Sequence, residues 1–127
     1  MSDKPVLIPG PDHPITVEKN PGRVVVTVGG AVIADSRDAL ALREADYPVA
    51  QYIPRKDVDF SQLERTEQQS YCPFKGEASY YSITTAGQSS ENSVWTYETP
   101  YDAVAQIREH VAFYPDRMDS IQILPAD

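Results

Sequence analysis

The run Tyr71-Cys72-Pro73-Phe74-Lys75-Gly76 holds the single cysteine of the chain and, three residues later, an isolated lysine. The aromatic pair Tyr80-Tyr81 follows closely. Thiols and amines become strong nucleophiles when their surroundings lower their pKa, and aromatic rings supply both desolvation and a flat surface for a ligand. This stretch is therefore the first place to expect a functional site.

Cys72 and Lys75 each have two interpretations. Cys72 is either a small buried hydrophobic residue or a reactive thiolate, since free cysteine is commonly buried. Lys75 precedes the flexible Gly76 in a turn, so its ammonium is either a solvated charge or a group that turns back beside the sulfur and attracts an anion. In either case we expect Lys75→Met to change the free energy of unfolding by no more than about 0.5 kcal/mol.

Four aromatic residues lie in segments with strand-like patterns: Tyr52, Tyr80, Trp95 and Tyr97. An aromatic residue in a strand usually belongs to the core, and its hydroxyl or indole N–H then needs a hydrogen-bond partner. Trp95 and Tyr97 are two residues apart, so they share one face of a strand. We expect Trp95 to be largely buried and these rings to wall a pocket near Lys75.

Asp116-Arg117 is a second candidate, because a turn can present a carboxylate and a guanidinium together towards a bound group. The alternative is a turn capped by the Asp116 side chain, with a surface arginine. Asp57 and Asp59 have a spacing that places two carboxylates on one face of a strand, as two-metal catalysis requires. A solvated acidic loop is the better explanation for that second pair.

Metal and cofactor sites are not expected. Structural zinc needs four ligands, usually paired Cys or His, and the chain offers only Cys72, His13 and His110. No glycine-rich segment precedes a helix in the arrangement that cradles phosphate. A general base for Cys72 is also missing unless a histidine reaches it, which weighs against cysteine–histidine catalysis. We predict no metal and no cofactor.

Composition limits the partners. The chain has 127 residues, 41% of them hydrophobic, which suffices for one domain with its own core. A formal charge of −8 disfavours nucleic acid and anionic lipid. No apolar run is long enough to span a membrane, and the N-terminal residues do not resemble a signal peptide. A single cysteine fits a reducing compartment, so we predict a cytoplasmic protein whose oligomeric state is open.

Residues 1–14, which contain four prolines, predict an extended N-terminal segment, and residues 15–127 predict a single β domain. Strand patterns cover residues 15–18 and 23–28, separated by Asn20-Pro21-Gly22, where glycine permits the positive φ of a turn. Gly29-Gly30 has the two-residue spacing of a type I′ or II′ hairpin. Further strands are expected over residues 31–35, 49–53, 78–84, 93–98, 111–114 and 118–124.

Other segments are less regular. Residues 37–46 contain good helix formers, yet the alternation of Leu40, Leu42 and Glu44 also permits a strand. Residues 54–69 predict a charged connection with a helical turn near 61–65, and residues 86–92 an exposed loop. Thr99 and Pro100 predict the N-cap and the first residue of a short C-terminal helix.

Several motifs occur in the order found in one bacterial family: Asp35-Ser36, Tyr47-Pro48, Tyr52-Ile53-Pro54, the run from Tyr71 to Ala78, Trp95-Thr96-Tyr97, and residues 111–117. From about residue 15 to 123 the chain resembles the family called domain of unknown function 427, which also carries a nucleotidyltransferase-like label. The resemblance implies a β-tent type of sheet, in a group with zinc-binding members, and favours a strand over residues 40–44. It also strengthens a functional role for Lys75. The chain lacks the motifs of nucleotide chemistry.

We therefore predict a mainly β protein: a single antiparallel folded-over sheet, β-tent-like, with one short C-terminal helix. The first functional hypothesis is binding of a small molecule, with an anion as one option, in an aromatic-lined pocket. The residues expected to contribute to it are Lys75, Cys72, Tyr80, Trp95, Tyr97 and Asp116. The alternatives are a small enzyme with Cys72 or Lys75 as nucleophile, and a module whose exposed tyrosines dock a partner protein.

Overall fold

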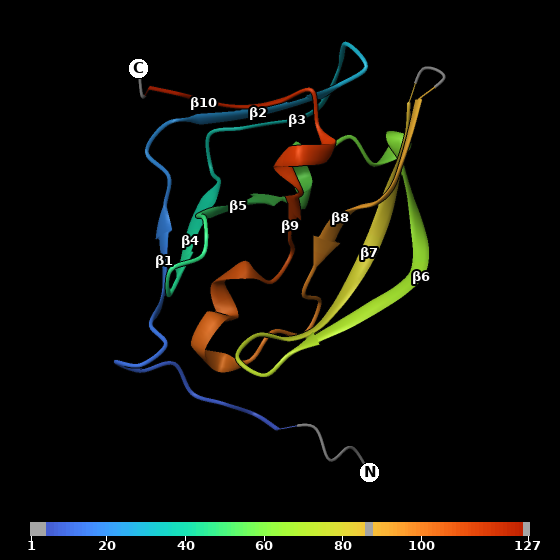
Figure 1. Ribbon diagram of the computed structural model, residues 1–127. Helices are drawn as coiled ribbons and strands as arrows, with labels where there is room; N and C mark the ends of the chain where they lie inside the picture. Colours follow the sequence, from blue (N-terminus) through green and yellow to red (C-terminus); the bar gives the residue numbers. More distant parts are fainter. Residues whose placement is uncertain (1–4, 86–87, 126–127) are drawn as a thin grey trace.

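Residues 5–85 and 88–125, which the computed structural model describes, form two antiparallel sheets. In this part of the chain the large sheet has seven strands in the order β1-β4-β5-β9-β8-β7-β6, and the small sheet has three in the order β10-β2-β3. The small sheet lies across the top of Figure 1, and the large sheet curves below it from β1 to β6. The prediction of a mainly β, antiparallel fold is confirmed.

The strands of the large sheet are β1 (Ile15–Lys19), β4 (Leu40–Glu44), β5 (Ala50–Pro54), β6 (Leu63–Cys72), β7 (Gly76–Thr85), β8 (Gln88–Thr96) and β9 (His110–Phe113). Those of the small sheet are β2 (Arg23–Val28), β3 (Ala31–Ser36) and β10 (Ser120–Leu124). The helical segments of the described residues are short 3₁₀ helices: η1 (Arg55–Asp57), η2 (Phe60–Gln62), η3 (Asp102–Ile107) and η4 (Pro115–Arg117). None of them is long and apolar enough to cross a membrane.

The hairpin predicted at Gly29-Gly30 is present. It joins β2 to β3, and both glycines have positive φ, 58° and 79°. A type I′ turn requires positive φ at both central residues, which glycine adopts without a steric penalty. The strand predicted over residues 40–44 is also present as β4, which pairs with β1 and β5.

The turn at Asn20-Pro21-Gly22 does not close a hairpin. It leads from β1 in the large sheet to β2 in the small sheet. Gly22 is not among the glycines with positive φ, so the predicted reason for glycine here is wrong. A Cβ atom at this position would lie 2.0 Å from the carbonyl oxygen of Leu124, so glycine is needed because the backbone of β10 passes so close.

The predicted connection over residues 54–69 is wrong from residue 63 onward. After η1 and η2 the chain forms the ten-residue strand β6 at the edge of the large sheet. Most β6 residues are exposed, so the strand needs no apolar alternation, and its pairing with β7 supplies the backbone hydrogen bonds. Likewise β8 begins at Gln88, within the expected loop 86–92, of which residues 86–87 lie outside the described residues.

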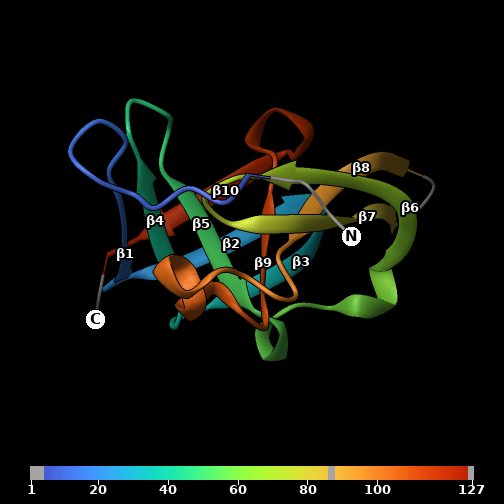
Figure 2. The ribbon, with the colours of Figure 1, turned by 90° about the horizontal axis from the view of Figure 1, so that it is seen from below.

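The C-terminal helix is the 3₁₀ segment η3, and its N-cap is Tyr101 rather than Thr99. The backbone N–H of Tyr101 donates to the carbonyl oxygen of Lys75 at 3.1 Å. This bond holds the preceding residues extended along the turn that contains Lys75, so the helix starts later than predicted. In Figure 2 η3 lies in front of β4 and β5, and its buried residues Val104 and Ile107 pack against them.

Each face of the large sheet has its own core. Neighbouring residues of a strand point to opposite faces, so Tyr52 and Ile53 of β5 belong to different clusters. The inter-sheet core fills the space towards the small sheet and includes Val24, Val26, Ile53, Tyr81, Val94 and Phe113. The outer core lies on the side of η3 and includes Leu42, Tyr52, Tyr80, Tyr97, Val104 and Ile107.

Candidate functional site

The turn between β6 and β7 fixes the position of Lys75. Its N–H donates to the carbonyl oxygen of Cys72 at 3.1 Å. Gly76 follows with a φ of 114°, and a Cβ atom there would lie 3.3 Å from the carbonyl oxygen of Thr99. Both the positive φ and the close approach favour glycine. The turn is thus held against residues 99–101, and the Lys75 side chain is directed into the outer face of the large sheet.

Lys75 is not a solvated turn residue. Its ammonium donates to the carboxylate of Glu44 at the end of β4, and the two side chains are only 12% and 10% exposed. The ammonium also lies 5.8 Å from the ring centroid of Tyr97, within the range of a cation–π contact. The sequence-based interpretation of a solvated charge is therefore wrong.

His13 completes this group, to which we refer as the Lys75 cluster: Lys75, Glu44 and His13. The second carboxylate oxygen of Glu44 is hydrogen-bonded to His13 Nε2 at 2.7 Å. The imidazole stacks on Phe74, with 4.0 Å between ring centroids and 5° between planes. The N–H of Leu7 donates to the carbonyl oxygen of Pro73 at 2.9 Å, so residues upstream of His13 also lie against the turn.

The Glu44 carboxyl is held in its anionic form. Burial by itself raises its pKa, but the hydrogen bonds from Lys75 and His13 outweigh burial and keep the pKa below the usual 4.5. Its negative charge neutralises the Lys75 ammonium within the protein. Lys75 therefore offers little net attraction to an anionic ligand.

The neighbouring tyrosines belong to the outer core. Burial is the main cause that raises the pKa of Tyr97, followed by electrostatic interactions with nearby ionisable groups, among them the Glu44 carboxylate. Burial likewise raises the pKa of Tyr52, whose hydroxyl accepts a hydrogen bond from the indole N–H of Trp95 at 3.0 Å. With pKa values raised above the usual 10 of tyrosine, these hydroxyls stay protonated at neutral pH.

Cys72 is half-buried beside this core. His13 is hydrogen-bonded to Glu44, and His110 Nδ1 is hydrogen-bonded to the carbonyl oxygen of Arg108 at 2.7 Å. Within residues 5–85 and 88–125, neither histidine is hydrogen-bonded to the thiol. Catalysis by the Cys72 thiol would require a general base, and from the sequence a histidine was the candidate. Because neither histidine is hydrogen-bonded to the sulfur, the structure does not support cysteine–histidine catalysis.

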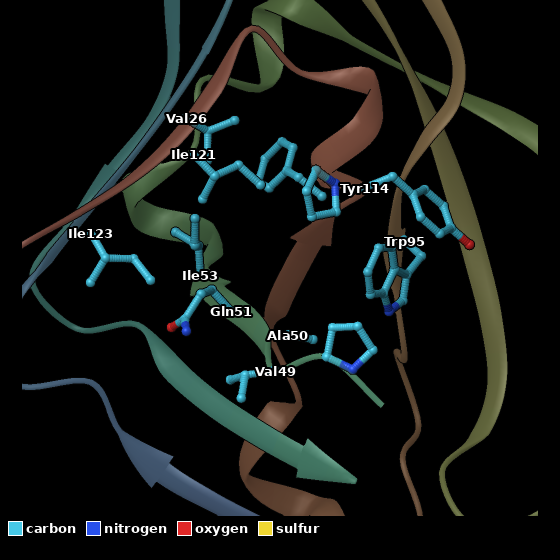
Figure 3. A pocket seen from close by; sticks show the side chains of 12 residues that line it. Val26, Val49, Ala50, Gln51, Ile53, Trp95, Tyr114, Ile121 and Ile123 are labelled. Atoms are coloured by element: carbon cyan, nitrogen blue, oxygen red, sulfur yellow. The ribbon is translucent and has the colours of Figure 1, made fainter. Parts of the chain in front are cut away.

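A separate pocket of about 560 Å³ opens between the two sheets. It lies where β5 and β9 separate, beyond their paired residues Ile53 and Val111. We call it the inter-sheet pocket (Figure 3). The small sheet contributes Val26, Ile121 and Ile123. The large sheet and its adjoining segments contribute the other lining residues, which are Pro48, Val49, Ala50, Gln51, Ile53, Trp95, Phe113, Tyr114 and Pro115.

Trp95 connects the pocket with the outer core. Its ring lies edge-on to Tyr52, at 6.1 Å and 89°, and tilted against Tyr114, at 4.5 Å and 44°. It is half-buried rather than fully enclosed. Of the predicted site residues, Trp95 alone lines the inter-sheet pocket. Lys75, Cys72, Tyr80 and Tyr97 gather on the outer face instead.

Asp116 lies apart from both groups. It is exposed in η4 and lines neither the pocket nor the Lys75 cluster. Arg117 donates to the carbonyl oxygens of Glu91 at 2.8 Å and Asn92 at 3.2 Å. The guanidinium therefore ties η4 to β8 and does not face a bound group together with Asp116.

The other acidic pair has structural partners. Asp57 accepts a hydrogen bond from the hydroxyl of Ser36 at 2.6 Å, and Asp59 caps η2 by accepting from the N–H of Ser61. Among the described residues, no group of three or more His, Cys, Asp or Glu side chains is arranged to hold a metal ion. The absence of a metal remains a prediction.

Sequence reasoning missed Glu44 and Gln51. A signal for Glu44 was available, because it continues the alternation of Leu40 and Leu42, and a carboxylate on a buried face requires a partner. The pocket had a weaker signal: Tyr47-Pro48 and Tyr114-Pro115 belong to the family motifs but were not connected with a site, yet Pro48, Tyr114 and Pro115 line it. The contribution of β2 and β10 had no signal in the sequence.

Two antiparallel sheets, a buried ion pair beneath the β6–β7 turn and an apolar pocket between the sheets characterise this small, mainly β protein. Residues 16–123 match the family described as a domain of unknown function (DUF427), and the chain belongs to this family. The resemblance inferred from the motifs is thereby confirmed. No curated protein matches the chain.

Proposed function

We propose that the protein binds a small, largely apolar molecule in the inter-sheet pocket. The main support is the pocket itself. Its volume of about 560 Å³ is in the range of small-molecule sites, and such sites are mostly apolar with a few polar groups. Aromatic rings, prolines and aliphatic side chains line it, with the amide of Gln51 as the polar exception.

The proposed ligand is neutral. No lysine or arginine is among the described residues that line the pocket, and the chain carries a formal charge of −8. An anion entering such a pocket would lose its hydration without gaining a counter-charge. The anionic option considered from the sequence depended on Lys75, whose charge Glu44 already neutralises.

The mouth of the pocket offers apolar surface to a ligand. Val49 and Ile123 are 38% and 55% exposed although both are large hydrophobic residues. Covering such side chains removes apolar surface from water, which favours binding. We assign Lys75, Cys72, Tyr80 and Tyr97 a supporting role, since the outer core to which they belong holds Tyr52, the hydrogen-bond partner of Trp95.

The proposed partner is thus a small molecule and not nucleic acid or a membrane, because the net negative charge opposes both phosphate backbones and anionic lipid. We propose the cytoplasm of a bacterium as the location. The single cysteine, which leaves no intramolecular disulfide to form, supports a reducing compartment.

Trp95 allows a direct test, because it is the single tryptophan of the chain and lines the pocket. Its indole N–H gives one signal in a ¹H–¹⁵N NMR spectrum. Titration with propylbenzene should shift this signal in a saturable way and raise the melting temperature. In Ala50→Phe, which fills the pocket without adding a second indole, the probe should no longer shift the Trp95 signal, whereas Asp116→Ala should behave as wild type. If the Ala50→Phe protein binds the probe as the wild type does, the ligand site lies elsewhere.

A further inference from the structure

We infer that the ligand of the inter-sheet pocket carries a hydrogen-bond acceptor, such as the carbonyl oxygen of a ketone, ester or amide, on an apolar or aromatic body. This inference rests on the proposed function, because it names the class of molecule that the pocket accepts. The orientation of the Gln51 side chain carries it.

The orientation begins at a backbone group. The N–H of Gly22 donates to Asn20 Oδ1 at 2.8 Å, and because a backbone N–H can only donate, it identifies the oxygen of the Asn20 amide. The amide nitrogen of Asn20 is therefore on the other side, where it donates to Gln51 Oε1 at 3.0 Å. Asn20 is itself buried, at 8% exposure. One backbone N–H thus fixes the orientation of both amides.

The –NH₂ group of Gln51 is the part left for a ligand. Its oxygen is engaged by Asn20, and the described residues supply no partner to its nitrogen. Figure 3 shows Gln51 among the apolar side chains that line the pocket. An amide –NH₂ donates hydrogen bonds and cannot accept them. A bound hydrocarbon would cover this donor without satisfying it, which costs free energy.

The other polar side-chain groups at the pocket are either hydrogen-bonded or directed away from it. The indole N–H of Trp95 donates to the hydroxyl of Tyr52 at 3.0 Å. The Tyr114 hydroxyl points away from the pocket in Figure 3. Burial, followed by the nearby Tyr80 hydroxyl, raises the pKa of Tyr114 to about 12, so it stays protonated. Gln51 is therefore the free side-chain donor among the described residues that line the pocket, and it selects a ligand with an acceptor.

Two probes of similar shape test the inference. Propiophenone has a carbonyl group where propylbenzene has a methylene group. In the wild-type protein, propiophenone should bind about three- to tenfold more tightly, the range expected for one neutral hydrogen bond. The indole signal of Trp95 reports binding of either probe. The side-chain –NH₂ signals of Gln51 should shift strongly only with the ketone.

Variants then separate the donor from the shape of the pocket. Gln51→Met keeps the length of the side chain but has no donor, so the two probes should bind equally. Asn20→Asp changes no lining residue. Its carboxylate cannot donate to Gln51, so the Gln51 amide should turn round, donate to the carboxylate and present its oxygen to the pocket. The ketone should then lose its advantage. Asp116→Ala is the control and should keep the wild-type preference.

The outcomes distinguish the two proposals. If neither probe shifts the Trp95 signal in the wild-type protein, the proposed function fails and the inference fails with it. If both probes bind equally to the wild type, or if the ketone keeps its advantage in a folded Gln51→Met protein, the pocket binds small molecules but Gln51 does not select an acceptor. Should Asn20→Asp not fold, as its melting curve would reveal, the comparison with Gln51→Met still decides.

Discussion

The ammonium of Lys75 and the carboxylate of Glu44 form an ion pair between strands that are not neighbours in the large sheet. Glu44 ends β4, while Lys75 lies in the turn before β7, and β5, β9 and β8 separate these strands in the sheet order. The two side chains are about nine-tenths buried. The pair therefore ties the β6–β7 hairpin across the outer face of the curved sheet.

Removal of the Lys75 ammonium should destabilise the fold. Without it, the buried Glu44 carboxylate keeps His13 as its one side-chain partner among the described residues. Breaking a buried pair by removing one partner is strongly destabilising, so Lys75→Met should lower the free energy of unfolding by about 3 kcal/mol. Urea denaturation measures this quantity. The expectation replaces the near-neutral effect predicted from the sequence.

A double-mutant cycle provides the control. Glu44→Leu alone leaves the Lys75 ammonium without its partner, whereas the combination with Lys75→Met removes both charges. The double variant should be less destabilised than the sum of the two single variants, by about 1–3 kcal/mol. Strict additivity, or a Lys75→Met effect within about 0.5 kcal/mol, would show that the contact contributes little to stability.

Acid should weaken the same contact. The pKa of Glu44 is lower in the folded protein than the usual 4.5, so the folded state binds its proton less readily than the unfolded state. The resulting stability is complete above pH 4.5 and is lost as the pH falls through the lower, folded-state pKa. The free energy of unfolding should therefore decline more steeply on acidification in the wild type than in Glu44→Gln.

The comparison with Glu44→Gln is needed because other carboxyl groups also have lowered pKa values. Hydrogen bonds from Arg23 and Lys56 lower those of Asp35 and Asp38, for example. These groups are present in both proteins and should contribute equally to both curves. Parallel pH profiles of the two proteins, measured by urea denaturation from pH 3 to pH 7, would contradict the assignment to Glu44.

Two glycines should respond differently to alanine. At Gly22 a Cβ atom would lie 2.0 Å from the carbonyl oxygen of Leu124, so β10 must move. Overpacking of this kind typically costs about 1–3 kcal/mol. At Gly10 no atom lies within 4 Å of the added Cβ, and φ is not positive. Thermal unfolding should show a clear loss for Gly22→Ala and little change for Gly10→Ala.

Trp95→Ala should be costly although the side chain is only half-buried. The substitution removes the contacts with Tyr52 and Tyr114 and leaves the Tyr52 hydroxyl without its donor. Truncation of a packed tryptophan typically costs about 3–5 kcal/mol, and partial exposure favours the lower end. Trp95→Phe, which keeps an aromatic ring, should lose less. Circular dichroism during denaturation checks both variants, and a wild-type midpoint for Trp95→Ala would remove the residue from the packed structure.

The sequence by itself determined the local elements. The alternating valines of β2 and the pair Gly29-Gly30 specify a strand and a tight hairpin, because side-chain periodicity and the sign of φ depend only on adjacent residues. For residues 40–44 the alternation of Leu40, Leu42 and Glu44 permitted the strand that forms, and the family resemblance favoured it over a helix. The family was recognised from short motifs, the run from Tyr71 to Ala78 among them.

The tertiary structure alone decided which groups meet. Lys75 and Glu44 are 31 residues apart, and nothing in their local sequences pairs them until the sheet order brings β4 and the β6–β7 turn to the same face. The edge position of β6 removed the need for an apolar pattern, so its residues resembled a loop. The inter-sheet pocket forms only when the small sheet packs over the large one. The same packing brings Asn20 to the side-chain oxygen of Gln51 and leaves the Gln51 –NH₂ group for a ligand, because burial and hydrogen-bond partners depend on the packing of the whole chain.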